Sequence, residues 1–359
     1  MSILNAKNAK NAKNAKNAKA LGDDALADSL LAEALLRARD GIVGSVQITG
    51  QTPGTPALNQ GERLARLSAD HRGAVVIAEL LEDMAFESDP GAGSPVAGAA
   101  RWLRRTAAGG LAPLAEFIAP KATDFQRAIP LVGGYADLRD DRMAEILAQT
   151  TDLRPFFATI LPLEAERSRR IGDLLSIALD LSDCTVMRVK LALGCPRPNQ
   201  FSNRIQPVIN TPAHGAFPSG HATQAFLLAT LLTLLDDPGA TLAADSQLFR
   251  MASRIAVNRT VAGVHYPADS AAGAMLGVVL GRYLAARADQ AGQAGGVRMD
   301  GNGWGQGDQP RDFHLGEFAQ MMTGNDPAAA FTPASPVRPA PLWGWLWAQA
   351  RKDWSDRWS

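Results

Sequence analysis

Three short stretches in the second half of the chain carry residue types that could do chemistry on a phosphate-like anion. The first contains Lys190 and Arg197, the second is a Pro-Ser-Gly-His sequence that ends at His221, and the third begins at Arg259 and includes His265. Cations and the N–H groups of a helix N-terminus are the groups that bind tetrahedral oxyanions. Imidazole titrates near neutral pH and can move protons. The sequence therefore predicts an oxyanion site with acid–base chemistry.

Each residue has a predicted role. The expected anion ligands carry a positive charge or lie at a helix N-terminus: Lys190, Arg197, Ser219, Gly220 and Arg259. His221 is expected to act as the acid or base. Asp269, four residues after His265 on one helical face, would keep one ring nitrogen protonated and leave the other free to bond the central atom. Taken singly, Ser219 could be only an N-cap, and His265 with Asp269 only a helix pair. The order and spacing of the three stretches favour the site.

Helices are expected to position these residues. Leucine, isoleucine and valine at helical spacing predict one long helix over Glu164–Leu193, and Pro196 and Pro198 end it. Ser219 is a favourable N-cap for a helix that runs to Leu235. Two further helices are predicted over Ala244–Val261 and Ala268–Arg287.

The remaining chain divides into parts of different composition. Asn-Ala-Lys repeats dominate residues 1–22, which we interpret as a low-complexity extension. Residues 23–150 form an N-terminal helical part with short helices at Val96–Ala108 and Asp141–Ala148, and residues 151–290 form the catalytic bundle. Residues 291–359 hold a glycine-rich linker, Gly292–Gly307, and a C-terminal helix. Strand signals of period two are almost absent, so the expected fold is an all-α helical bundle.

Four tryptophans, Trp343, Trp347, Trp354 and Trp358, lie on one face of the expected C-terminal helix. Such a stripe is typical of a packed or oligomer-forming face rather than of a membrane anchor. The sequence alone leaves open which of these two the stripe is.

Composition excludes several classes of partner and location. Lysine plus arginine equals aspartate plus glutamate, 36 each, so no charge excess points to nucleic acid or an anionic membrane. No signal peptide or membrane span is visible, which predicts a soluble, cytoplasmic protein. Cys184 and Cys195 are expected to be free thiols because their separation is too large for a disulfide.

The three stretches resemble the superfamily that joins type 2 phosphatidic acid phosphatases, bacterial non-specific acid phosphatases and vanadium-dependent haloperoxidases. The superfamily pattern is Lys-x6-Arg-Pro, Pro-Ser-Gly-His and Ser-Arg-x5-His-x3-Asp. The match is complete except that Asn258 replaces the serine before Arg259. The resemblance implies a helical bundle of the haloperoxidase and acid phosphatase type. It also implies that His265 is either the nucleophile on phosphorus or the ligand of vanadium.

One histidine favours the haloperoxidase. His214 lies seven residues before His221, where vanadium bromoperoxidases are similar in having histidine. This implies vanadate as cofactor, or phosphate in the same site, with hydrogen peroxide, halide (bromide or iodide) and an organic acceptor as substrates and hypohalous acid as product. Lys190 would polarise the peroxide. Haloperoxidases that resemble this chain are commonly oligomeric, which implies a homo-oligomer with the tryptophan stripe as its dimer contact. Met187, where haloperoxidases tend to have tryptophan or arginine, and the shorter chain argue against this reading.

Two other functions stay open. The first is a phosphatase that hydrolyses phosphomonoesters through a phosphohistidine. The second is a binding or scaffold protein that has lost activity, although all the expected anion ligands and both histidines of the pattern are present.

Overall fold

The computed structural model describes residues 30–38, 58–89, 98–164, 167–305 and 309–356. The chain divides into two units, Met1–Leu58 and Asn59–Ser359. In the first, residues 30–38 are helical, as expected for the N-terminal helical part, and they are exposed. The predicted extension 1–22 and Trp358 lie outside the described residues. All further structure described below belongs to the second unit.

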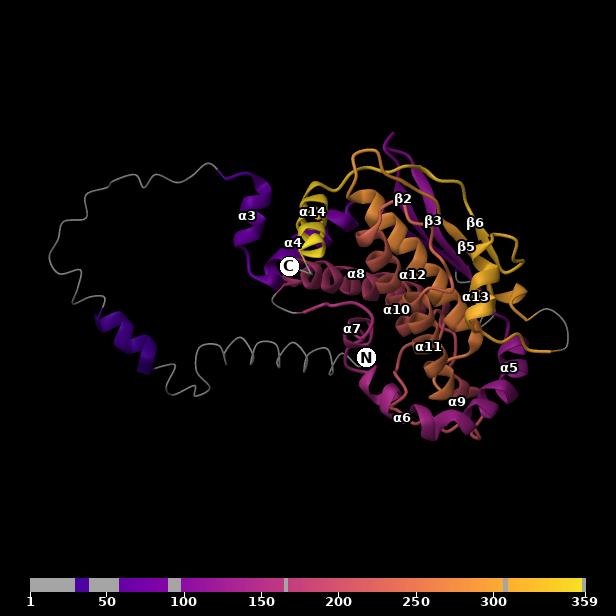
Figure 1. Ribbon diagram of the computed structural model, residues 1–359. Helices are drawn as coiled ribbons and strands as arrows, with labels where there is room; N and C mark the ends of the chain where they lie inside the picture. Colours follow the sequence, from indigo (N-terminus) through magenta and orange to yellow (C-terminus); the bar gives the residue numbers. More distant parts are fainter. Residues whose placement is uncertain (1–29, 39–57, 90–97, 165–166, 306–308, 357–359) are drawn as a thin grey trace. The chain divides into compact units, whose positions relative to one another are not determined.

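Helices make up most of this unit (Figure 1). They are α3 (Gln60–Arg66), α4 (Ala69–Leu81), α5 (Ala122–Gly134), α6 (Arg139–Ala148), α7 (Arg154–Ala158), α8 (Arg169–Leu193), α9 (Pro198–Phe201), α10 (Gly220–Asp236), α11 (Gln247–Val261), α12 (Pro267–Arg287), α13 (Leu315–Met322) and α14 (Pro341–Ser355), with 3-10 turns at Tyr135–Leu138 and Gly301–Gly303. The helices predicted around the site are present, and their bounds differ by a few residues.

The expectation of an all-α fold is wrong, because the unit also contains two sheets. The strands are β1 (Met84–Asp89), β2 (Ala99–Arg105), β3 (Leu111–Ile118), β4 (Gln293–Ala294), β5 (Val297–Asp300), β6 (Ala329–Phe331) and β7 (Ser335–Pro336). Five strands form a sheet in the order β1-β2-β3-β5-β6, in which only β3 and β5 are parallel, and β4 pairs with β7. Figure 1 shows the larger sheet beside the helices.

Strand β2 falls where a short helix was expected at Val96–Ala108, so the helical prediction for residues 23–150 is wrong there. A register shift between Trp102 and Leu103 turns both side chains inward and breaks the period-two alternation. Arg104 is also buried, and its guanidinium is held by Ala294 O and by Ser335 Oγ at 2.7 Å. Alanine, arginine and leucine favour helix, so pairing with neighbouring strands overrides local preference here.

The predicted glycine-rich linker Gly292–Gly307 is also wrong, since it contains β4 and β5. Its glycines permit close approach between segments. A Cβ on Gly295 would lie 2.4 Å from Thr332 O, and one on Gly296 would lie 2.5 Å from Pro113 O. These glycines therefore let the segment between β4 and β5 approach the backbone of β3 and the residue that follows β6.

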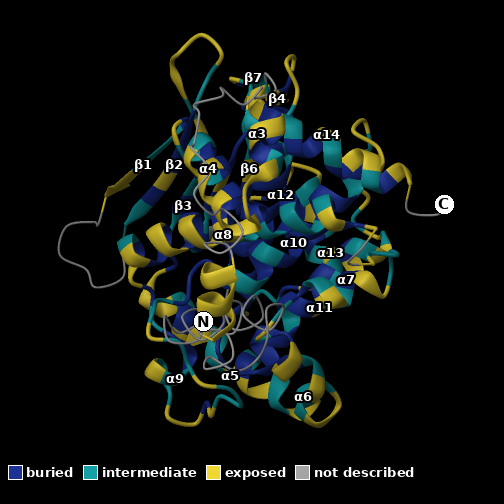
Figure 2. Ribbon diagram, turned by 90° about the vertical axis from the view of Figure 1, so that its left-hand side faces the viewer, coloured by how far each residue is buried: buried dark blue, intermediate teal, exposed yellow. Residues whose placement is uncertain are grey.

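Helices α10 and α12 form the centre of the molecule. Helix α10 is apolar on all sides and is buried along its length, as its dark colour in Figure 2 shows. Three glycines of α12 face α10, and Cβ atoms on Gly273 and Gly277 would lie 2.5 Å from Ser219 O and 2.4 Å from Thr223 O. The two helix backbones are therefore almost in contact, and this contact fixes the start of α10 against α12.

The tryptophan stripe of α14 packs inside the chain, which overturns its expected role as a dimer contact. Trp343, Trp347 and Trp354 belong to the main hydrophobic core. Trp343 Nε1 donates to Leu284 O at 2.7 Å, and Trp354 Nε1 donates to Asp236 Oδ1 at 2.8 Å. A homo-oligomer stays a prediction, and it would need another surface.

Two smaller predictions can be compared with the described residues. Cys184 is exposed, Cys195 is buried, and both are free thiols as expected. Among the described helices, none combines the length and apolar character that a membrane crossing requires.

Candidate active site

The end of α8 positions the first two cations. Gly194 adopts a left-handed conformation (φ 57°), and its N–H caps the helix by donating to Lys190 O at 3.0 Å. Pro196 and Pro198 then prevent further helix. The chain turns sharply after α8, and the turn brings Arg197 back toward Lys190.

Lys190 is buried and holds the loop that precedes the second motif. Its Nζ donates to Gly215 O at 2.7 Å and to Ala216 O at 2.8 Å. An ammonium group has three N–H bonds, so one remains for a ligand. Burial lowers the pKa of Lys190 well below its usual value, and the charge of Arg197 lowers it further.

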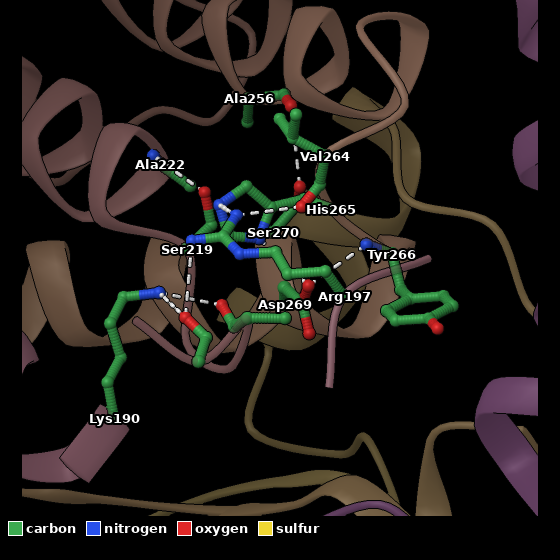
Figure 3. A network of polar contacts seen from close by, with 12 residues as sticks. Lys190, Arg197, Ser219, Ala222, Ala256, Val264, His265, Tyr266, Asp269 and Ser270 are labelled. Atoms are coloured by element: carbon green, nitrogen blue, oxygen red, sulfur yellow. Dashed lines mark hydrogen bonds and ion pairs between the residues drawn. The ribbon is translucent and has the colours of Figure 1, made fainter. Parts of the chain in front are cut away.

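Arg197 lies at the middle of the pocket, with 1% of its surface exposed. Its Nη1 donates to Val264 O at 2.8 Å and lies 3.1 Å from His265 Nε2. Its Nη2 lies 3.1 Å from His214 Nδ1. Burial lowers the pKa of Arg197 to about 10, so the guanidinium stays charged at neutral pH. Arg197, which belongs to the first stretch, therefore contacts Val264 and His265 of the third stretch (Figure 3).

His265 and Asp269 are paired as predicted, but they do not share a helical face, because α12 begins at Pro267 and His265 precedes it. His265 Nδ1 lies 2.8 Å from Asp269 Oδ2, which also accepts the N–H of Tyr266 at 2.9 Å. With Nδ1 protonated, Nε2 carries the lone pair and accepts from Arg197. Burial, followed by the charges of Arg197 and Lys190, lowers the pKa of His265 well below its usual value. Burial raises the pKa of Asp269 to about 7.

The start of α10 supplies the helix N-terminus. Ser219 is its N-cap, with Oγ accepting the N–H of Ala222 at 3.4 Å. The N–H of Ser219 donates to Asp269 O at 2.8 Å, so it is not the free donor that the sequence suggested. Within the described residues, the N–H groups of Gly220 and His221 have no hydrogen-bond partner. These two groups, with the Ser219 hydroxyl, are the donors available to an anion.

Arg259 is buried, and not all of its donor atoms have a hydrogen-bond partner. Its Nη2 donates to Gln149 Oε1 at 2.9 Å and to Ile146 O at 3.3 Å. Its Nε and Nη1 are buried without a partner in the described part of the chain. Burial lowers the pKa of Arg259 to about 10. An unpaired buried cation is costly, so these donors point to a ligand that is an acceptor.

His221 is partly accessible and lies between two of these groups. Its Nε2 lies 3.1 Å from Gln149 O, which favours the tautomer with the proton on Nε2. Burial, and then the charge of Arg259, lowers the pKa of His221 well below its usual value. The imidazole is therefore neutral in the free site and would gain affinity for a proton when an anion binds.

His214 also belongs to the site. Besides its contact with Arg197, its Nδ1 lies 3.2 Å from Gly215 O. Burial, and then the charge of Lys190, lowers its pKa to about 4. His214 is half-buried, and it lies with Gly215, Gly220 and His221 on the more accessible side of the site.

One network of contacts and electrostatic effects thus joins eight of the residues predicted for the site, and the ninth, Gly220, lies between two of them in the chain. The eight are Lys190, Arg197, His214, Ser219, His221, Arg259, His265 and Asp269. Sequence reasoning missed Gln149, which lies at the end of α6 and contacts both Arg259 and His221. No pattern around Gln149 marks it, because its neighbours in space are more than 70 residues away in sequence. The replacement of serine by Asn258 was the nearest signal, since Asn258 also contacts Gln149.

Comparison with known proteins agrees with this geometry. A family model described as PAP2 superfamily matches residues 174–291. The segment 174–291 therefore belongs to the PAP2 superfamily, which agrees with the resemblance of the three stretches. Among solved structures, a similar one is the first transmembrane PAP2 type phosphatidylglycerolphosphate phosphatase from Bacillus subtilis, at 17% identity and TM-score 0.34, covering 45% of this chain and 83% of that chain. A search of the curated proteins gave no match.

The PAP2 match covers all nine of these site residues, whereas α6 lies outside it. The described residues contain no group of three or more histidine, cysteine, aspartate or glutamate side chains that could hold a metal ion. Vanadate is an anion and needs a different donor set. The cations, the unpartnered Arg259 donors and the lone pair of His265 Nε2 fit either vanadate or phosphate.

Binding of a dianion to this PAP2 site is expected to take up protons. His221 and His265 have lowered pKa values in the free site, and a bound negative charge favours their protonated forms and raises those values. Sulfate is a suitable probe because it exchanges no proton near pH 7. Calorimetry at pH 7 in two buffers of different ionisation enthalpy should show net proton uptake. Proton release, or binding heats that do not depend on the buffer, would contradict the assignment of these groups.

Proposed function

We propose that this PAP2 protein is a phosphatase that hydrolyses phosphomonoesters through a phosphohistidine on His265. One observation carries the proposal. Three cations that are at most 2% exposed, Lys190, Arg197 and Arg259, lie in one site with one buried carboxylate, Asp269. The excess positive charge is stabilised when an anionic group binds. The PAP2 family match supports a phosphatase-type reaction.

The free site prepares the nucleophile. Asp269 holds His265 Nδ1 in its protonated form, which directs the Nε2 lone pair toward Arg197. An incoming phosphoryl group would take the place of His265 Nε2 as the acceptor for Arg197 Nη1. Nε2 then attacks phosphorus and the bond to the alkoxide breaks. Asp269 stabilises the positive charge that develops on the imidazole ring.

His221 moves the proton. Once the dianion has raised its pKa, His221 is protonated and donates to the leaving alkoxide. In the second step the neutral His221 takes a proton from water, and the hydroxide attacks the phosphohistidine. The N–P bond breaks, phosphate leaves, and His265 Nε2 regains its lone pair. Lys190, Arg197 and Arg259 stabilise the oxygens of both transition states.

A second candidate function is that of a vanadate-dependent haloperoxidase, and His214 is the observation that favours it. Its contact with Arg197 places an imidazole beside the anion ligands. Lys190, Arg197, Ser219, Gly220 and Arg259 would hold vanadate, with His265 Nε2 as its protein ligand. Bound vanadate would supply the activation of hydrogen peroxide for halide oxidation. The same side chains would position it and exclude water.

One assay separates the two functions. Purified protein is given an aryl phosphate without vanadate and, in parallel, bromide with hydrogen peroxide after loading with vanadate. We expect phosphate release and an acid-labile, base-stable phosphoprotein, with vanadate as an inhibitor. Bromide oxidation without phosphate release would instead favour the haloperoxidase. Neither activity, with phosphate still bound, would favour a binding protein.

Replacing His214 by phenylalanine tests the second candidate. The imidazole contact with Arg197 is lost, so halide oxidation should change by about tenfold or more in rate or selectivity. Vanadate should remain bound, because the other ligands are untouched. The conservative variant His214→Gln offers an amide acceptor and should recover part of the rate. Unchanged halide selectivity and rate in His214→Phe would remove His214 from halide and peroxide handling.

A further inference from the structure

The C-terminal end of α6 touches two members of the anion site through one residue. Gln149 is the C-cap residue of α6, is 1% exposed, and lies outside the segment that the PAP2 family matches. Its backbone carbonyl is 3.1 Å from His221 Nε2, and its side-chain Oε1 accepts from Arg259 Nη2 at 2.9 Å. Main chain and side chain of a single residue therefore contact the proposed acid–base group and an anion-binding cation.

Asn258 holds this end of α6 in place. Its Nδ2 donates to Glu145 Oε2 at 3.1 Å and to Gln149 Oε1 at 3.2 Å, and its Oδ1 accepts from Arg142 Nη1 at 3.2 Å. Asn258 is fully buried and stands where the superfamily pattern has serine. A serine side chain is shorter and could not make all these contacts. The departure from the pattern thus coincides with the docking of α6 on α11.

The hydrogen bonds determine which way the Gln149 amide points. Oε1 faces two groups that can only donate, Arg259 Nη2 and Asn258 Nδ2, so the oxygen and nitrogen are correctly placed. The amide nitrogen Nε2 faces elsewhere, and it is buried without a partner in the described part of the chain. Arg259 Nε and Nη1 are also buried without a partner in the described part of the chain. These three buried N–H-bearing atoms on two adjacent side chains each need an acceptor, and a tetrahedral anion offers several acceptor oxygens.

The side-chain amide of Gln149 is neutral, so it does not cancel the positive charge of Arg259. Arg259 has no ion pair with a carboxylate in the described residues, and burial is the cause of its lowered pKa. A carboxylate at position 149 would neutralise the arginine and repel a dianion. An amide accepts from Arg259 and leaves its positive charge available to the ligand.

We propose that Gln149 is a further ligand of the bound oxyanion, donating through Nε2 beside Arg259 while its carbonyl orients His221. The inference rests on the proposed function, since it assigns another residue to the same anion site. The ligand class is a tetrahedral dianion such as phosphate.

The test uses the isosteric variant Gln149→Glu in the full chain. Glutamate keeps the acceptor for Arg259 and Asn258, so a residue that is only structural would be preserved. It lacks the donor and adds a charge, so the Kd for inorganic phosphate should rise by at least about tenfold, with the midpoint of thermal unfolding little changed. Gln126→Glu, an exposed position on α5, is the matched control and should leave the Kd unchanged.

A second variant covers the case in which Gln149→Glu does not fold. Gln149→Met has a similar size without donor or acceptor, and it should also weaken phosphate binding and raise KM more than it lowers kcat. If either folded variant binds phosphate as tightly as the wild-type chain, Gln149 is not a ligand and the inference is overturned while the proposed function stands. If the wild-type chain itself binds no phosphate, the proposed function and this inference both fail.

Discussion

The variant His265→Ala is expected to lose at least about 10⁴-fold in kcat for phosphomonoester hydrolysis, because the N–P bond cannot form without the imidazole. Binding of phosphate should change by less than about tenfold, since Lys190, Arg197 and Arg259 remain. The substitution should therefore lower kcat far more than it weakens phosphate binding. The variant should also form no acid-labile phosphoprotein. The measurements are steady-state kinetics, trapping of the intermediate by rapid quench, and calorimetric phosphate binding.

The control for this variant is His71→Ala. His71 is exposed in the first turn of α4. Within the described residues, its side chain has a hydrogen bond with Ser68 and with no other residue. It should keep wild-type kcat and phosphate affinity. If folded His265→Ala hydrolyses phosphomonoesters within tenfold of the wild-type rate, His265 is not the nucleophile. The haloperoxidase candidate would lose its protein ligand for vanadate in the same variant, so that activity should vanish as well.

The variant Gly273→Ala is expected to lower the free energy of unfolding by about 3 kcal/mol, which is large for one methyl group. The added Cβ would lie 2.5 Å from Ser219 O, 2.9 Å from Ala222 Cβ and 3.2 Å from Thr223 N. Two of these atoms are backbone, so α10 must move away from α12. Because Ser219 begins the anion-binding helix, phosphate affinity should fall together with stability.

Gly172→Ala is the matched control. Gly172 lies in α8, and its added Cβ would meet nothing within 4 Å. Alanine favours helix over glycine by about 1 kcal/mol, so this variant should be slightly more stable and bind phosphate normally. Denaturant unfolding of both variants gives the comparison. A Gly273→Ala protein as stable as the wild type would mean that the close contact of α10 and α12 is not needed.

The site residues could be predicted from sequence because their chemistry is local. His265 and Asp269 are close in sequence, and their 2.8 Å contact forms across the start of α12, where Asp269 in the first turn also accepts the N–H of the N-cap residue Tyr266. Ser219 begins a helix because a serine followed by an apolar run is a helix start. Lys190 and Arg197 are separated by a helix end that two prolines enforce.

The errors came from segments whose state depends on distant partners. Strand β2 contains good helix formers and a buried arginine, and its neighbours β1 and β3 decide its conformation. Gly295 and Gly296 suggested a linker, although they are glycine because other backbones approach them closely. The tryptophans of α14 formed the predicted stripe, but the partner surface turned out to be the chain's own core.

The amino-acid sequence by itself determined which residues make the oxyanion site, because short-range spacing and helix capping decide their local geometry. Only the tertiary structure decided that a sheet covers the bundle, that Ser219 N–H is already bonded to Asp269, and that Gln149 stands beside Arg259 and His221. These contacts join residues far apart in the chain. Packing of whole elements produces them, and no spacing along the sequence encodes them.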